Sequence, residues 1–245
     1  MALETIFGIH SVQAVLKTAP QRVKQLLVLR GRHDQRVQKV LASAQKQEIP
    51  VKLVDRKDLD VLVEGAHQGM VAMVTPGELY DEKFLYQMLD NLEVTPLLLM
   101  LDGVTDPHNL GACMRTAEAA GVHAVIAPKD NSASLNATAR KVACGAAEVL
   151  PYITVTNLSR TLSQLQERGL WVIGTAGEAE QSVYQADLKG PLILVMGAEE
   201  KGMRRLTREH CDGLINIPMA GEVSSLNVSV ATGVCLFEAV RQRNA

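Results

Sequence analysis

The segment at residues 102–121, DGVTDPHNLGACMRTAEAAG, combines a turn, a helix start and a cationic side chain. Its Asp-Pro step predicts the turn. Asn109 can cap the helix that follows, so that the first backbone amides face the end of the preceding strand. Arg115 lies six residues further on among small neighbours, and its long side chain can reach back along the helix. Arg115 is therefore either a functional cation or one half of a surface ion pair with Glu118 or Asp102.

A second, glycine-containing segment, MGAEEKGM at residues 196–203, also follows an expected strand. It is not a Walker motif, because Lys201 precedes the second glycine instead of following it, and no G-x-G-x-x-G fingerprint is present. These absences argue against a nucleotide triphosphatase, a dinucleotide-dependent oxidoreductase and the usual Rossmann-type methyltransferase. The glycines indicate close approach of the backbone to another group. Glu199 or Glu200 is a candidate general acid or base; the alternative is a carboxylate that stabilises a helix start.

The third segment, at residues 217–240, crowds small polar side chains around one helix start. Ser224, Ser225 and Asn227 lie at the helix start, and Ser229 and Thr232 follow on an otherwise apolar stretch. One of them is needed as a cap. The others are available to hydrogen-bond a carboxylate, an adenine or a hydroxyl group of a ligand.

Other catalytic signatures are absent from the sequence. There is no G-x-S-x-G elbow, no H-E-x-x-H and no zinc-deaminase pattern. The four cysteines are scattered without a C-x-x-C pair, which argues against a zinc knuckle or a disulfide framework. We therefore predict buried, reduced thiols and no metal site.

These segments must be positioned by an alternating pattern of strands and helices. Short apolar strands without polar alternation predict a parallel sheet covered on both faces. Ligands of such sheets bind at the carboxyl ends of the strands. The predicted strands are Leu97–Leu101, Ala124–Ala127, Ile153–Val155, Leu170–Gly174, Leu192–Met196 and Leu214–Ile217. The predicted helices are Leu110–Ala120, Ala137–Cys144, Leu158–Glu167, Met203–Arg208 and Leu226–Arg241.

Residues 1–76 are predicted to form a separate, small α/β domain with a basic surface. The predicted helices lie at residues 10–19, 35–47 and 57–63, and the strands at residues 25–29, 51–54 and 70–74. Between Lys17 and Lys57 the chain holds 11 basic and 3 acidic residues. Such an excess attracts the phosphate backbone of a nucleic acid; the alternative is a solvated helical face.

The acidic stretch at residues 77–96 is predicted to be a linker, with one short helix at about Lys83–Leu92. Residues 97–245 then form the second domain.

The composition of the whole chain, 47% hydrophobic and 21% charged, excludes a disordered chain, a coiled coil and collagen. Aromatic residues make up only 3%, which argues against single-strand binding by base stacking.

A membrane location is not expected. The longest apolar runs are far too short to span a bilayer. Glu4 stands where a signal peptide needs positive charge. We therefore expect a cytoplasmic protein.

Three stretches, in this order at strand ends, resemble the three motifs of the TrmH-type RNA methyltransferases of the SPOUT superfamily. They are DPHNLGACMRTA (106–117), VMGAEEKGM (195–203) and IPMAGEVSSLNVSVATG (217–233). The match covers about residues 95–245. FGIHSVQAVL (7–16) and HQGMVAMV (67–74) resemble the ends of a ribosomal-protein-like RNA-binding domain that precedes it in several members. As a whole, the chain is similar to bacterial members that methylate a guanosine 2′-hydroxyl of 23S ribosomal RNA.

The resemblance implies methyl transfer from S-adenosylmethionine to a ribose hydroxyl, without a metal. It also implies a deep trefoil knot in the C-terminal domain, with the cofactor bent into it, and a homodimer with the active site near the subunit interface. By position, the family's catalytic set falls on Asn109, Arg115, Glu199, Ser225 and Asn227. Its cofactor contacts, largely through backbone groups, fall on Gly197, Ile217 and Leu226.

A ribose hydroxyl is weakly acidic, so its proton must leave or the developing oxyanion must be stabilised. The family's motif-one arginine is often described as the general base, but a guanidinium stays protonated. We therefore expect Arg115 to hold the adjacent phosphate and stabilise the alkoxide, while Glu199, Ser225 and Asn227 orient the groups. Two alternatives stand beside this interpretation: a transfer-RNA ribose methyltransferase, and a non-catalytic RNA-binding assembly factor on a decayed fold.

Overall fold

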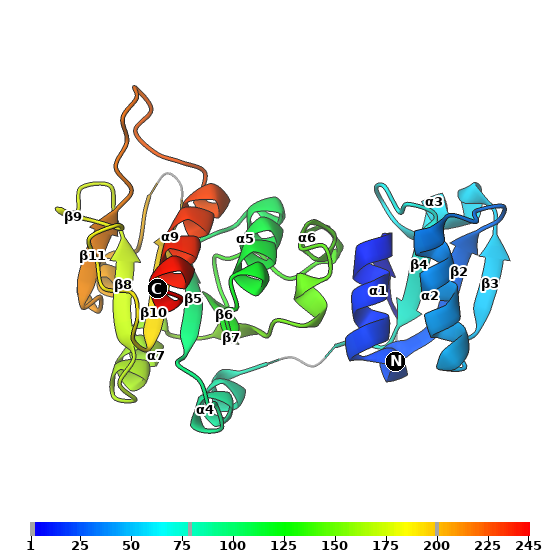
Figure 1. Cartoon of the computed structure of the whole chain (residues 1–245), viewed down its shortest axis with the longest axis horizontal. Helices are drawn as coiled ribbons and strands as arrows, with labels where there is room; N and C mark the ends of the chain where they lie inside the picture. The colour runs from blue at the N-terminus through cyan, green and yellow to red at the C-terminus, as the bar shows by residue number, and fades with distance from the viewer. Residues whose placement is uncertain (1–2, 78–79, 199–200) are drawn as a thin grey trace. The chain divides into compact units, whose positions relative to one another are not determined.

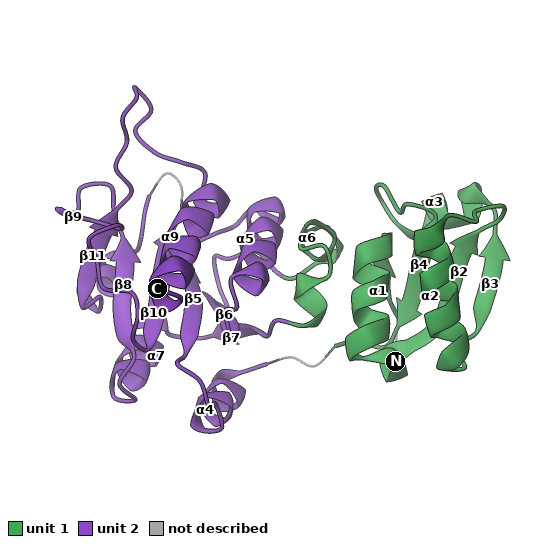
Figure 2. Cartoon of the chain, in the orientation of Figure 1, with its two compact units in different colours: residues 1–78, 135–149 green, residues 79–134, 150–245 purple. Residues whose placement is uncertain are grey.

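The computed structural model describes residues 3–77, 80–198 and 201–245, which fold into two compact units (Figures 1 and 2). The first unit comprises residues 1–78 and 135–149, and the second comprises residues 79–134 and 150–245. The sequence does not indicate that the chain returns to the first unit. The domain boundaries at residues 76 and 96 stay a prediction.

The first unit is built on a four-stranded sheet with the order β1-β4-β2-β3. β4 runs antiparallel to both β1 and β2, whereas β2 and β3 are parallel. The strands are β1 (Glu4–Phe7), β2 (Val23–Leu29), β3 (Val51–Val54) and β4 (Met70–Val74). The helices are α1 (Ile9–Thr18), α2 (Gln35–Lys46), α3 (Arg56–Leu62) and α6 (Ala137–Val142), with 3-10 turns at Pro20–Arg22 and Ala146–Glu148.

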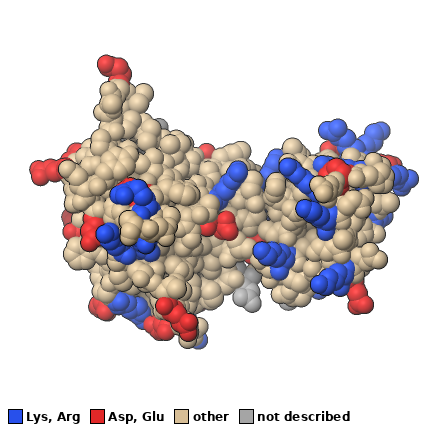
Figure 3. Space-filling view, in the orientation of Figure 1, with Lys and Arg blue, Asp and Glu red and all other residues tan. Residues whose placement is uncertain are grey.

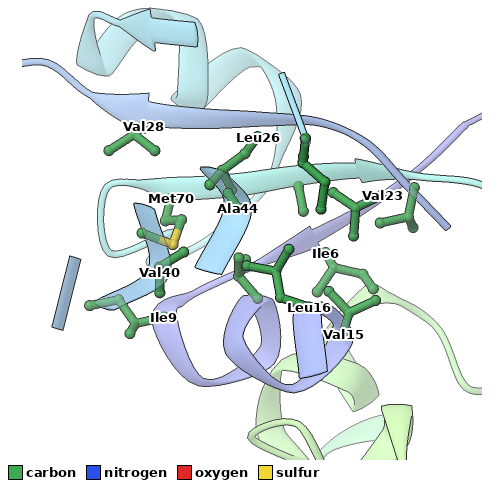
Figure 4. Packing of buried hydrophobic residues seen from close by; sticks show 14 of the residues in the cluster. Ile6, Ile9, Val15, Leu16, Val23, Leu26, Val28, Val40, Ala44 and Met70 are labelled. Carbon is green, nitrogen blue, oxygen red and sulfur yellow. The ribbon is translucent and has the colours of Figure 1, made fainter. Parts of the chain in front are cut away.

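Alternation along β2 places apolar side chains on both faces of this sheet. Leu26 and Val28 belong to a buried cluster with α1 and α2, while Leu27 belongs to a second cluster with Leu59 of α3. Figure 4 shows the first cluster, in which strand residues face Leu16 of α1. Because strand side chains alternate with a period of two, one strand supports both helical layers.

The segment at residues 135–149 is joined to the first unit by a buried carboxylate. The side chain of Glu148 is 1% exposed and pairs with Arg22 at 3.1 Å and with Arg140 at 2.7 Å. A buried carboxylate is tolerated only with such partners. Arg22 therefore connects the first 78 residues to a segment far along the chain.

The second unit is a parallel sheet of seven strands with the order β7-β6-β5-β10-β8-β11-β9. The strands are β5 (Leu97–Asp102), β6 (Ala124–Pro128), β7 (Tyr152–Val155), β8 (Trp171–Thr175), β9 (Gln181–Ser182), β10 (Leu192–Gly197) and β11 (Gly213–Asn216). The helices are α4 (Glu82–Asp90), α5 (Pro107–Ala119), α7 (Leu158–Gln166), α8 (Arg205–Glu209) and α9 (Val228–Arg243).

Helices cover the sheet of the second unit. α4 and α7 pack into one cluster with alternate residues of the central strands, and α9 packs on β10 and on α5. The acidic stretch that the sequence suggests as a linker contributes Leu85 of α4, which is fully buried in that cluster. Negative charge on the exposed side of a helix is compatible with an apolar buried side.

The predicted fold class is confirmed: a small α/β unit precedes a parallel sheet. The six predicted strands of the second unit are present, and each predicted end agrees with the structure or differs by one residue. β1 and β9 escape prediction, because each is at most four residues long and carries little apolar pattern. The trefoil knot stays a prediction. Among the described helices, none combines the length and the apolar character that a membrane span requires.

Candidate functional site

A cavity of about 880 Å³ lies at the carboxyl ends of β8, β10 and β11. This is the edge at which a parallel sheet binds ligands. Four of the predicted site residues belong to its wall: Gly197, Ile217, Ser225 and Leu226. The second and third motifs therefore meet in space at one cavity.

Gly197, the last residue of β10, is required by close backbone packing. A Cβ atom at this position would lie 2.3 Å from the carbonyl carbon of Gly202 and 2.3 Å from the amide nitrogen of Met203. Beside it, Ala198 and Gly202 exchange backbone hydrogen bonds of 3.1 and 2.8 Å. The glycines predict a close backbone approach, and the structure shows that it lies between Gly197 and the backbone of Gly202 and Met203, at the cavity wall.

The expected cap of α5 is wrong. The helix begins at Pro107, and Asp106 is its N-cap, with a carboxylate oxygen that accepts from the amide of His108 at 2.9 Å. Proline has no N–H to satisfy and favours the first position of a helix, which moves the start two residues upstream of Asn109. Asn109 therefore lies inside the first turn, where its side chain serves another contact.

That contact joins the first motif to the third. The side-chain amide of Asn227 donates to Oδ1 of Asn109 at 3.0 Å. The Oδ1 of Asn227 caps α9 by accepting from the amide of Ser229 at 2.9 Å and from its hydroxyl at 2.6 Å. Asn227 is thus both the cap of α9 and the link between the starts of two helices.

With Asn227 as the cap, Ser224 and Ser225 are available to the cavity, as the surplus of polar residues suggests. Thr232 is not available. It is fully buried, and its hydroxyl donates to the carbonyl of Val228 at 2.7 Å. A helical threonine commonly satisfies its hydroxyl in this way.

Arg115 is exposed on α5, and neither it nor Asn109 or Asn227 contributes to the described cavity wall. Asp102, one of the ion-pair partners considered for it, pairs with Arg204 at 2.6 Å. Glu199 and Glu200 lie outside the described residues. The two asparagines thus lie at helix starts and Arg115 lies further along α5, whereas the residues expected to contact the cofactor line the cavity.

Three charged side chains of the cavity lining are not predicted from the sequence. They are Glu178, Glu180 and Arg208, and they follow β8 or belong to α8. The Arg208 guanidinium hydrogen-bonds Glu178 and lowers the pKa of that carboxyl below its usual value. The strand-end rule could have indicated these residues, because Glu178 and Glu180 follow β8 at the same edge of the sheet.

Within the described residues, no cluster of three or more His, Cys, Asp or Glu side chains is arranged to hold a metal ion. All four cysteines are reduced thiols, and Cys211 is half-buried. Cys113 and Cys235 are buried as expected, and burial raises the pKa of Cys235 to about 12. The expectation is wrong for Cys144, which is exposed on a left-handed turn after α6.

Two family descriptions match this chain. The SpoU rRNA Methylase family matches residues 96–237. A family described as RNA 2′-O ribose methyltransferase substrate binding matches residues 5–80.

Relatives extend the match over nearly the whole chain. A Pseudomonas aeruginosa protein named 23S rRNA (guanosine-2′-O-)-methyltransferase RlmB is 65% identical over 98% of this chain and 97% of its own length. The Escherichia coli K12 protein of the same name is 60% identical over 98% of this chain and 99% of its own. A crystal structure described as an RNA 2′-O ribose methyltransferase aligns with a TM-score of 0.81 at 26% identity, over 99% of this chain and 90% of that one.

Proposed function

The chain belongs to the SpoU rRNA methylase family, and from this premise we propose that it methylates the 2′-hydroxyl of a guanosine in 23S ribosomal RNA with S-adenosylmethionine as donor. The family membership predicted from the three motifs is confirmed. One observation carries the proposal within the structure: the second and third motifs line one cavity, and the Asn109–Asn227 hydrogen bond joins the first motif to the third.

The cavity fits S-adenosylmethionine. Its volume of about 880 Å³ is in the usual range for small-molecule sites. Ile217 and Leu226 offer apolar surface, and the glycine at 197 brings backbone close. Glu180 offers negative charge to a sulfonium, whereas the Glu178 carboxylate is paired with Arg208. When bound, this cofactor supplies an electrophilic methyl group on a sulfonium. We assign Gly197, Ile217 and Leu226 as its contacts.

On the RNA side, Arg115 is the proposed centre of charge stabilisation. Its guanidinium stays protonated, so it holds the phosphate next to the target ribose and donates to the developing alkoxide, while the hydroxyl proton leaves to solvent. The hydrogen-bonded amides of Asn109 and Asn227 are fixed at two helix starts and orient the hydroxyl. Ser225 is proposed to act from the cavity wall, and Glu199 completes the set.

The first unit is proposed to bind the RNA. Its match to a substrate-binding family and the excess of basic residues between Lys17 and Lys57 support this role. Figure 3 shows lysine and arginine side chains spread over the visible face of this unit. Because the proposed substrate is bacterial ribosomal RNA, we place the reaction in the cytoplasm.

We also propose a homodimer that packs through α9. Val230 and Phe237 are 52% and 49% exposed, and they lie seven residues apart on one face of this helix. Exposed apolar faces of this kind mark interaction sites.

Sedimentation of the intact protein should give twice the chain mass of 26.6 kDa, and Phe237→Asp should reduce the measured mass to that of one chain. Val61→Asp, at an exposed apolar residue of the first unit, should leave the mass unchanged. A monomeric wild type contradicts the dimer.

The activity is tested with the intact protein, isotopically labelled S-adenosylmethionine and 23S RNA from cells that lack this protein. We expect label on the 2′-oxygen of a guanosine, located by nuclease digestion and mass spectrometry. Transfer RNA from the same cells is the matched alternative substrate, and label there alone would support the transfer-RNA hypothesis. No transfer, together with no heat on calorimetric titration with the cofactor, would support the non-catalytic alternative.

A further inference from the structure

We propose that Asp102 and Arg204 form an ion pair that positions the loop after β10, which makes Arg204 a positioning residue for cofactor binding. The loop is residues 198–203, of which 199 and 200 lie outside the described part. The inference rests on the proposed function, because it concerns the cavity assigned to the cofactor.

Asp102 is a buried carboxylate at the end of an otherwise apolar strand. Its side chain is 0% exposed, and the five preceding residues of β5 are all buried and apolar. Its Oδ2 accepts from the backbone amide of Arg204 at 2.8 Å, and its Oδ1 accepts from Nε of the same residue at 2.6 Å. A buried charge is costly unless it is paired and hydrogen-bonded, so both contacts contribute to holding Arg204.

Asp102 lies beside both ends of the loop, through strand pairing at one end and through its carboxylate at the other. Asp102 is the register partner of Gly197, the residue at which the chain leaves β10. Asp102 also accepts a hydrogen bond from the backbone amide of Arg204, the residue that precedes α8. Between these points, Ala198 and Gly202 exchange backbone hydrogen bonds. The end of β5 therefore holds Arg204, which directly follows Met203, and the Ala198–Gly202 hydrogen bonds join the described residues on the two sides of the loop.

This loop forms part of the cavity wall. Ala198, Lys201, Gly202 and Met203 all line the cavity. Met203 also packs closely against β8, since a Cβ atom at Gly174 would lie 2.6 Å from its terminal methyl carbon. Release of Arg204 lets the end of the loop shift, which changes the cavity wall. Arg115 and the Asn109–Asn227 bond belong to α5 and α9, so this shift should leave them in place.

The neighbouring arginine offers a matched control. Arg205 pairs with Glu209 four residues along α8 at 2.6 Å, with 78% of its side chain exposed. Exposed pairs of this kind contribute little to stability. Arg204→Ala and Arg205→Ala remove the same side chain from adjacent positions, but only the first breaks a bond to a buried carboxylate.

Calorimetry with S-adenosylmethionine and steady-state kinetics test the pair. We expect Arg204→Ala to raise both Kd and KM for the cofactor by about tenfold, a typical value for one lost hydrogen bond to a charged group. Asp102→Ala removes both bonds and should raise them further. Arg204→Lys keeps the cation and the amide and should fall between wild type and Arg204→Ala. The kcat at saturating cofactor and the KM for RNA should stay within about twofold of wild type in each case.

A purely structural role predicts a different pattern, in which Arg204→Ala lowers the melting temperature but leaves cofactor affinity and KM unchanged; that result overturns the proposal. Equal effects of Arg204→Ala and Arg205→Ala also overturn it. If Asp102→Ala does not fold, Arg204→Ala decides alone, because it removes only the partly exposed partner. A wild type that binds no cofactor overturns the proposed function and this inference together, whereas normal binding by wild type and Arg204→Ala alike overturns the inference only.

Discussion

Replacing Arg115 by alanine lowers kcat for RNA methylation by about 10²–10³-fold. The magnitude is that of removing one preorganised donor to a developing oxyanion. The Kd for S-adenosylmethionine should stay within about twofold, because Arg115 does not contribute to the described cavity wall. Single-turnover kinetics at saturating RNA and cofactor, with calorimetry in parallel, measure the two effects.

Two further variants separate the roles that Arg115 can have. Arg115→Lys keeps the charge but loses the planar set of donors, so kcat should still fall by more than about tenfold. Glu118→Gln tests the ion-pair alternative on the same helix, since a mere surface pair would make its effect equal to that of Arg115→Ala. Near-normal turnover by Arg115→Lys would show that the guanidinium does not have the proposed role.

The second large effect is expected from Gly197→Ala. The added methyl would meet the backbone at Gly202 and Met203, 2.3 Å away, and backbone cannot move aside as a flexible side chain can. Overpacking of this kind lowers the free energy of unfolding by about 1–3 kcal/mol. The displaced cavity wall should weaken cofactor binding by about a hundredfold, the equivalent of about 2.7 kcal/mol.

Gly221→Ala is the control, because a Cβ atom there meets no heavy atom within 4 Å. It should leave both the urea midpoint and the cofactor affinity unchanged. Unaltered cofactor affinity in Gly197→Ala would mean that the end of β10 is not part of the binding site.

Local sequence patterns predict the strands of the second unit and the place of the cavity. Consecutive apolar residues define buried strands, and the strand-end rule then points to the segments after β10 and β11. Within these segments, the resemblance to the TrmH-type family implies Gly197, Ile217, Ser225 and Leu226, and these four residues line one cavity. The predicted cap of α5 is wrong by less than one turn, because Asp106 and Pro107 together start the helix before Asn109. Element boundaries depend on competing local preferences and are therefore less certain than the elements themselves.

Long-range pairings escape prediction for a different reason. Asp102 and Arg204 are 102 residues apart, and nothing in either segment indicates the other. The burial of Leu85 likewise depends on a tertiary contact of α4 that a short acidic stretch does not reveal. Such contacts depend on how the strands are arranged in the sheet, so they cannot be predicted from either segment alone.

The bond between Arg22 and Glu148 has a consequence for the synthesis of the protein on the ribosome. The two residues are 126 positions apart, so the N-terminal sheet emerges long before the carboxylate that completes its packing. Until the later segment has been translated, Arg22 has no access to this partner. The nascent first unit therefore stays incompletely assembled until residues 79–148 have been synthesised.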